Sequence, residues 1–162
     1  MSRILLIEDD DICRRIVEIM LKNLGLMDIV CAEDGELGLK LFDRMDTPPD
    51  VVISDIFMPN KDGIEIVNAL VERKFSGGLI LMSGADPSMV QIAQLIAVRG
   101  QLKILATLRK PLNEKALANV LHGQLPSLNN WFFVNFTVII CSLRDNPVFQ
   151  NYQKHYEGHR AV

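Results

Sequence analysis

The chain has 162 residues, a length that suits one domain with a short appendage and allows a sizeable buried core. Its 49% hydrophobic and 23% charged residues are ordinary for a soluble globular protein. A formal net charge of −3 gives no electrostatic reason to expect binding to nucleic acid or to an anionic membrane, since both favour clustered Lys and Arg.

The cysteines and the apolar stretches indicate a cytoplasmic protein. Cys13, Cys31 and Cys141 are an odd, scattered set without metal-ligand spacing, which is typical of reduced thiols. The N-terminus runs at once into an apolar strand pattern followed by acids, so we expect no signal peptide. The longest apolar stretch, residues 131–143, is interrupted by Asn135 and is shorter than a membrane span.

Apolar runs alternate with helical patterns from residue 3 to about residue 123. This alternation is typical of β/α units and predicts an α/β fold with a mostly parallel sheet. The predicted strands are residues 4–7, 27–32, 51–54, 79–82 and 104–108, and the predicted helices are residues 12–24, 35–45, 64–71, 87–99 and 114–121.

Residues at the helix ends support these boundaries. Asp10 or Asp11 can cap the first helix, and Gly25 stands where a left-handed residue would end it. Pro87 suits the first turn of the fourth helix, and Asn113 can cap the last one.

The composition changes beyond residue 123. Seven of the ten aromatic residues follow residue 130, and the stretch 126–130 resembles linker sequence. We therefore predict a domain over residues 1–123 and an aromatic-rich tail over residues 124–162, which serves as a linker or association segment. The tail is too small for an independent core, and its aromatic, β-branched stretch cannot stay exposed without inviting association.

Four predicted strands are each followed by a polar residue suited to a phosphate and metal site. These residues are Glu8 with Asp9, then Asp55, Ser83 and Lys110. The carboxyl ends of parallel strands lie along one edge of a sheet, and ligands bind at that edge in open α/β folds. Three crowded acids favour a bound cation, and Mg²⁺ prefers such oxygen ligands.

The same residues suit phosphoryl transfer. An Asp carboxylate such as that of Asp55 can act as a nucleophile toward phosphorus. Lys110 would offset the charge that develops on the phosphoryl oxygens, and Ser83 would donate a hydrogen bond to one of them.

Over residues 3 to about 122 the sequence resembles the receiver domain of two-component response regulators. The matching motifs are Ile4-Leu5-Leu6-Ile7-Glu8-Asp9-Asp10, Asp55-Ile56-Phe57-Met58-Pro59 with Asp62-Gly63, Met82-Ser83-Gly84, and Lys110-Pro111. The resemblance implies a flavodoxin-like, doubly wound, five-stranded parallel sheet of order 2-1-3-4-5, here with a short C-terminal appendage.

The resemblance also implies a role for each site residue. Asp55 would be the phosphoacceptor, and Glu8, Asp9, Asp55 and the backbone carbonyl of Phe57 would hold Mg²⁺. Ser83 would be the switch hydroxyl and Lys110 the phosphate-pairing lysine, with a cis bond to the proline that follows it.

In that role the chain would be a phosphorelay switch and not an enzyme beyond its own phosphorylation and dephosphorylation. Its partner would be a sensor histidine kinase or a phosphotransfer protein. A homodimer through the tail or through helices four and five is a further expectation.

Two departures from the receiver pattern bear on the output. Thr107 stands three residues before Lys110, where receivers commonly carry an aromatic switch residue. The stretch from Ser83 to Lys110 is longer than in compact receivers and looks like receivers joined to EAL-type cyclic-di-GMP phosphodiesterases. The chain contains no Glu-Ala-Leu triplet, and its tail is too short for such a domain.

Other functions remain as alternatives. A degenerate receiver could act as a constitutive dimerisation or docking module, which the threonine at position 107 and the unusual tail would suit. A phosphatase with an Asp nucleophile would need a second Asp where Phe57 stands. A flavodoxin-like FMN site would need a phosphate-binding loop where Glu8 and the acids after it stand.

Overall fold

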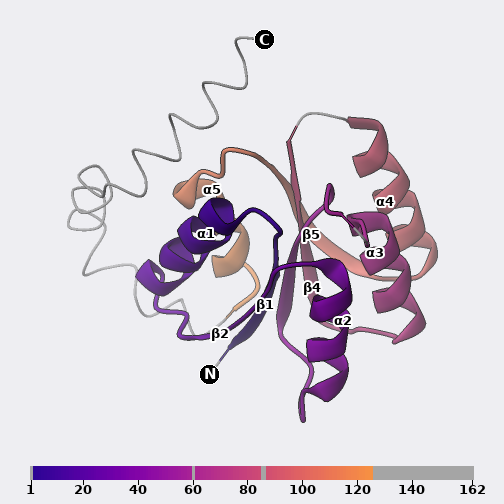
Figure 1. Cartoon of the computed structure of the whole chain (residues 1–162), viewed down its shortest axis with the longest axis horizontal. Helices are drawn as coiled ribbons and strands as arrows, with labels where there is room; N and C mark the ends of the chain where they lie inside the picture. The colour runs from indigo at the N-terminus through magenta and orange to yellow at the C-terminus, as the bar shows by residue number, and fades with distance from the viewer. Residues whose placement is uncertain (1, 60, 85–86, 126–162) are drawn as a thin grey trace.

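The computed structural model describes residues 2–59, 61–84 and 87–125 (Figure 1). The strands are β1 (Arg3–Ile7), β2 (Asp28–Ala32), β3 (Val51–Asp55), β4 (Gly78–Ser83) and β5 (Lys103–Arg109). The helices are α1 (Asp11–Asn23), α2 (Gly35–Arg44), α3 (Gly63–Glu72), α4 (Pro87–Arg99) and α5 (Glu114–His122). The aromatic stretch and nearly all of the predicted tail lie outside the described residues.

The strands form one parallel sheet of order β2-β1-β3-β4-β5, which confirms the predicted fold class. Figure 1 shows α1 and α5 on one face of this sheet and α2, α3 and α4 on the other. Strand order reverses between β1 and β3, and such switch points bind ligands at the carboxyl ends of the strands.

Short polar side chains begin the helices at that edge. Asp10 accepts a hydrogen bond from the backbone amide of Cys13, and Asp34 caps α2 in the same way. Asp62 and Glu65 form a reciprocal capping box at the start of α3. These bonds satisfy amides that have no partner within the helix, and they fix where each helix leaves the sheet edge.

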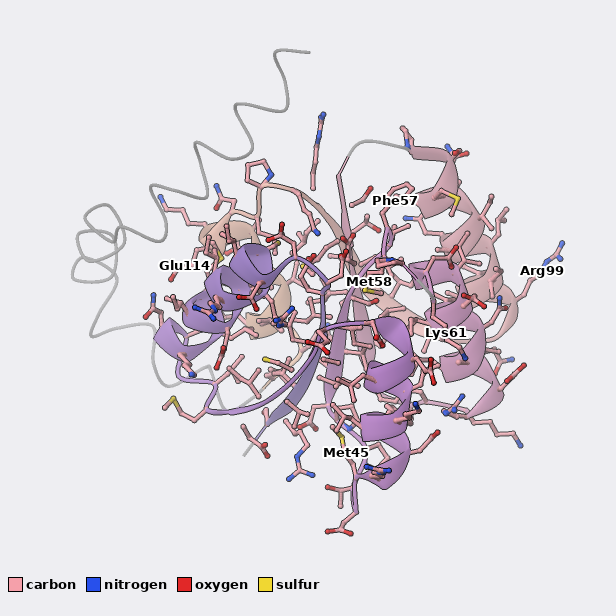
Figure 2. The ribbon with its side chains drawn as sticks, in the orientation of Figure 1. Met45, Phe57, Met58, Lys61, Arg99 and Glu114 are labelled. Atoms are coloured by element: carbon pink, nitrogen blue, oxygen red, sulfur yellow. The ribbon has the colours of Figure 1, made fainter. Side chains whose placement is uncertain are left out.

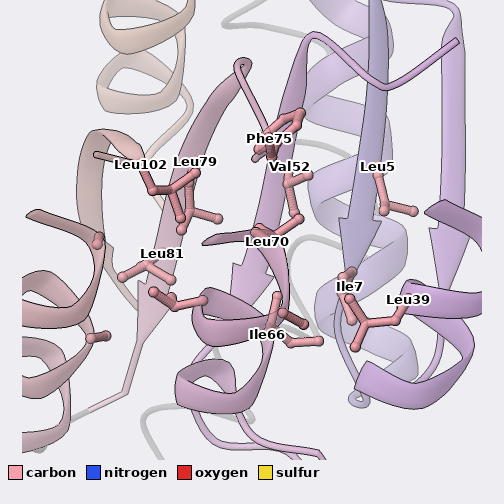
Figure 3. Close-up of a cluster of buried hydrophobic side chains, with 14 of the residues drawn as sticks. Leu5, Ile7, Leu39, Val52, Ile66, Leu70, Phe75, Leu79, Leu81 and Leu102 are labelled. Atoms are coloured by element: carbon pink, nitrogen blue, oxygen red, sulfur yellow. The ribbon is translucent and has the colours of Figure 1, made fainter. Parts of the chain in front are cut away.

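Both faces of the sheet are covered by apolar side chains. One cluster lies between the sheet and α1 and α5, and it reaches Leu125 at the end of the described chain. Figure 3 shows part of the other cluster, in which Ile7, Leu70 and Leu81 lie between the sheet and its helices. The central strands β3 and β4 are buried along their whole length, as the continuous apolar runs predict.

A few element boundaries differ from the predicted ones. Met27 is 60% exposed and precedes β2, so the apolar pattern placed the start of this strand one residue early. Strand β5 extends to Lys103 and Arg109, whose polar side chains hid its full length. Gly25 has the left-handed φ of 81° expected after α1. Among the described residues, none of the helices combines the length and the hydropathy needed to cross a membrane.

Candidate functional site

The register of the strands brings the predicted site residues together. Ile7 lies opposite Ser54, so Glu8 and Asp55, one residue further along their strands, lie side by side. Ser83 lies opposite Arg109, so Lys110 is the next residue beyond the end of that pair. Glu8, Asp55, Ser83 and Lys110 are all buried, at 0%, 4%, 7% and 8% exposure.

The Asp55 carboxylate is held by three donors. One of its oxygens, Oδ1, accepts hydrogen bonds from the backbone amides of Ile56 at 2.6 Å and Phe57 at 3.2 Å. The other, Oδ2, accepts from the ammonium of Lys110 at 2.5 Å. The carboxylate orientation is therefore set before any ligand arrives, which is the preorganisation that a nucleophile needs.

Lys110 contacts two acids with one ammonium group. Its Nζ lies 2.5 Å from Asp55 Oδ2 and 2.6 Å from Glu8 Oε2. Burial acts to lower the pKa of Lys110, but the groups of Cys13, Glu8 and Asp55 and the hydrogen bond to Asp55 raise it. The lysine therefore stays protonated, and its bond to Pro111 is cis, as the resemblance implies.

Glu8 and its two acidic neighbours form a candidate cation site. Ligand oxygens of Glu8, Asp9 and Asp55 lie within 4.8 Å of one another. Glu8 Oε2 is buried and lies 2.6 Å from the Lys110 ammonium. Burial raises the pKa of Glu8 to about 7, opposed by Lys110 and reinforced by Asp55.

The donor set fits Mg²⁺. Two buried carboxylates face inward, and the exposed Asp9 leaves the solvent side open for the water ligands that this ion retains. A cation would also relieve the repulsion among the three acids.

The remaining predicted residues lie at the same edge. Ser83 ends β4 beside the acids, and its backbone carbonyl accepts a hydrogen bond from Lys110 N at 2.8 Å. The Phe57 side chain is 44% exposed, and Figure 2 shows it in the upper part of the view, above the carboxyl ends of the strands. A Cβ built on Gly84 would meet no atom of the described residues within 4 Å.

Sequence reasoning missed two contacts around this site. The Arg14 guanidinium on α1 donates to the backbone carbonyls of Glu8 at 2.8 Å and Asp9 at 3.4 Å, and it forms an ion pair with Asp11. Gln94 on α4 donates from its side chain to the Thr107 hydroxyl at 3.3 Å. A helical arginine or glutamine carries no signal of such contacts, although the helical spacing does place Arg14 over the start of its own helix.

Comparison with known proteins identifies the class to which this fold and site belong. Residues 4–122 match the family described as the response regulator receiver domain. The chain is 31% identical over 111 residues to the probable chemotaxis protein CheY of Rhizobium etli, covering 67% of this chain and 84% of that protein. The chain belongs to the response regulator receiver family.

Two further similarities define the extent of the match. The chain is 33% identical over 84 residues to the probable C4-dicarboxylate response regulator DctR of Bacillus subtilis, but spans only 36% of its length. A response regulator receiver domain from Clostridium thermocellum has the same fold, with a TM-score of 0.67, 23% identity, and coverage of 78% of this chain and 96% of that one.

Proposed function

We propose that the chain is a phosphoacceptor switch in which Asp55 receives a phosphoryl group from a histidine kinase or a phosphotransfer protein. Receiver domains are phosphorelay switches that interact with such partners, and the chain belongs to that family. The observation that carries the proposal is the buried contact of one lysine, Lys110, with both Asp55 and Glu8 at the switch point of the sheet.

Each site residue has its own role in the proposed phosphoryl transfer. A carboxylate oxygen of Asp55 forms the new bond to phosphorus while the bond from phosphorus to the donor breaks, and the donor retains that electron pair. Lys110 neutralises charge that builds on the phosphoryl oxygens, and the Ser83 hydroxyl can donate to one of them. The backbone amides of Ile56 and Phe57 keep the nucleophile in place.

Glu8, Asp9, Asp55 and the Phe57 carbonyl would hold Mg²⁺ in this proposal. When bound, the ion supplies charge neutralisation at the phosphoryl oxygens. The support is the set of ligand oxygens from Glu8, Asp9 and Asp55, which lie within 4.8 Å of one another.

Incubation with Mg²⁺ and acetyl phosphate tests the proposal. We expect the intact mass of the chain to rise by one phosphoryl group, only with Mg²⁺ present, and Asp55→Asn to show no gain. Asp62→Asn is the matched control, because that aspartate caps α3 and takes no part in the acidic set. A folded chain that gains no mass, or an Asp55→Asn variant that still does, would refute this function.

One observation favours the second function, a constitutive docking module. Residue 107 is a threonine, whose hydroxyl accepts a hydrogen bond from the Gln94 side chain, so this position offers no aromatic ring that could rotate on phosphorylation. If the chain is a docking module, its sedimentation and small-angle scattering will be the same before and after complete labelling of Asp55. A change in either measurement supports the switch.

Arg14 is expected to position the metal ligands. Arg14→Gln frees the Glu8 and Asp9 carbonyls, and it should raise the Mg²⁺ concentration for half-maximal labelling by about 10-fold, as loss of a contact that orients a metal ligand commonly does. Arg15→Gln is the control, because Arg15 is 69% exposed and forms an exposed ion pair with Asp11. Equal shifts in the two variants, or a shift explained by a lower unfolding midpoint alone, would contradict the prediction.

The expected location, dimerisation and domain boundary stay proposals. We place the chain in the cytoplasm, with dimerisation through α4 and α5 or through the tail, and with residues 1–123 as the receiver unit. The resemblance to receivers joined to EAL-type phosphodiesterases rests on the length of the stretch from Ser83 to Lys110 and stays a prediction.

A further inference from the structure

One side of β2 is an edge of the sheet. Within the described residues β2 pairs only with β1, on its inner side. The Ala32 carbonyl accepts a hydrogen bond from the Glu8 amide at 3.1 Å, and the backbone groups of a strand point alternately to its two sides. The amides and carbonyls of Ile29 and Cys31 therefore point away from β1, toward the outer side of β2.

The residues of β2 do not protect this edge. Sheet edges are commonly protected by lysine, by proline or by irregular pairing. β2 contains neither lysine nor proline, and its one charged residue, Asp28, is paired with Arg3 on the neighbouring strand. The opposite edge strand, β5, carries Lys103 and Arg109 at its ends and has a register shift in its pairing with β4. Of the two edges, β2 is therefore the one that favours the addition of a strand.

The sequence beyond the described domain contains a segment suited to that edge. Nine of the ten residues from Trp131 to Ile140 are aromatic or β-branched, and these types favour strands. None of the ten is charged, glycine or proline, so nothing in the segment opposes pairing within a sheet. The segment is therefore predicted to pair with a strand that has unpaired backbone groups.

The topology directs this segment to β2 and not to β5. Helix α5 lies on the same face of the sheet as α1 (Figure 1), and α1 connects β1 to β2 by a step toward the β2 edge. Connections between parallel strands nearly always have the same hand, so a parallel strand after α5 has to step in the same direction. A step from β5 in that direction can end only at the outer side of β2, because β4, β3, β1 and β2 occupy the positions between.

The described chain also ends at a suitable place. The side-chain oxygen of Gln124 accepts a hydrogen bond at 2.5 Å from the ammonium of Lys103, the first residue of β5, so α5 returns the chain to the edge where the parallel strands begin. Leu125 is buried between the sheet and α1 and α5, in the same cluster as Leu26, which precedes β2. The six peptide links from Leu125 to Trp131 can span about 20 Å, or about four strand spacings. Because the path starts inside this layer, that reach suffices for the outer side of β2.

We propose that residues 131–140 pair with the outer side of β2 as a sixth, parallel strand of the same sheet. This pairing would satisfy the backbone groups of Ile29 and Cys31 and would close an edge that otherwise invites association. The short connection keeps the segment at a roughly millimolar effective concentration beside β2, which a second copy would have to match in solution. The proposal leaves α4 and the edge that carries the acids available to partners, and it does not depend on phosphorylation.

Amide hydrogen exchange of the full-length chain, followed residue by residue by NMR, tests the proposal. We expect the amides of Ile29 and Cys31 to be protected to the same extent at every protein concentration. Val134→Pro removes a donor from the segment, and proline is not accommodated inside a sheet, so both amides should exchange about tenfold faster or more. The substitution lies outside the described domain, and protected amides of Ile16 and Met20 in α1 would show that the domain stays folded.

Val134→Ile is the matched control, because isoleucine keeps the amide and the preference for a strand, and it should leave the exchange unchanged. Unprotected amides at Ile29 and Cys31 in the unmodified chain overturn the proposal, as does protection that Val134→Pro leaves intact. Protection that grows with concentration assigns the edge to a second copy and also overturns it. Loss of protection from β5 and not from β2 in Val134→Pro would place the segment at the opposite edge, with the same consequence.

Discussion

Replacing Lys110 by methionine is expected to slow the labelling of Asp55 by acetyl phosphate about 100- to 1000-fold. A preorganised donor that faces developing negative charge commonly contributes a factor of this size. Methionine keeps much of the length and packing of the lysine stem but removes the ammonium that contacts Asp55 and Glu8. The measurement is the initial rate of mass gain at saturating Mg²⁺.

The same change should reduce stability by roughly 1–3 kcal/mol at neutral pH, because two buried carboxylates lose their shared partner. The pKa of Glu8 already lies near 7, above its ordinary value, so the folded state binds a proton there more readily than the unfolded state does. This proton stabilises the fold at low pH, and its contribution is lost as pH rises through that value. The deficit of Lys110→Met should therefore be smaller near about pH 5 than near about pH 8.

Lys40→Met is the control for this experiment, because Lys40 forms only an exposed pair with Glu36. It should change neither the labelling rate nor the urea midpoint appreciably. A Lys110→Met variant that is labelled at the wild-type rate would contradict the assigned role of the lysine. A stability deficit that grew on acidification would contradict the electrostatic explanation.

Replacing Gly63 by alanine is expected to disturb both the fold and the site. A Cβ at this position would lie 2.6 Å from Ile56 Cα and 2.8 Å from the Asp55 carbonyl oxygen, both of which are backbone atoms. Backbone can move aside only by displacing the end of β3, which carries Asp55. We expect a loss of about 1–3 kcal/mol in urea unfolding, as for overpacking in a core, together with slower labelling of Asp55.

Gly123→Ala is the matched control. It adds the same methyl group at the end of α5, where the nearest atoms lie at 3.8 and 4.0 Å and the backbone φ of −67° suits any residue. Its stability should be unchanged or slightly higher, because alanine restricts the unfolded chain. Equal losses in the two variants would mean that the contact with the Asp55 backbone does not explain the effect.

The sequence predicts the sheet and the site for the same physical reason. Ile53 and Leu81 belong to continuous apolar runs, and a run of that length bounded by breakers is typical of a buried parallel strand. Because each run ends in a polar residue, the parallel arrangement alone brings Glu8, Asp55 and Lys110 to one edge. The order of the strands came from family resemblance, since alternation of elements does not fix it.

Contacts that depend on the direction of a side chain could not be predicted from the sequence. Arg14 turns back along its helix to two carbonyls, and nothing in its neighbours distinguishes it from Arg15. Gln94 contacts Thr107 because α4 packs beside β5 with these two residues next to each other. Met27 shows the opposite error, in which apolar character alone suggested a strand residue that is in fact exposed.

In the part of the chain that the structure describes, the five helices all follow the carboxyl ends of strands, so their N-termini gather at the edge that carries the acids. Each helix start carries a partial positive charge of roughly half a unit from its aligned peptide dipoles. An anionic phosphodonor that approaches Glu8, Asp9 and Asp55 therefore meets less repulsion than the acids alone would produce. The backbone thus contributes positive potential at this edge, in addition to the ammonium of Lys110 that contacts Asp55 and Glu8.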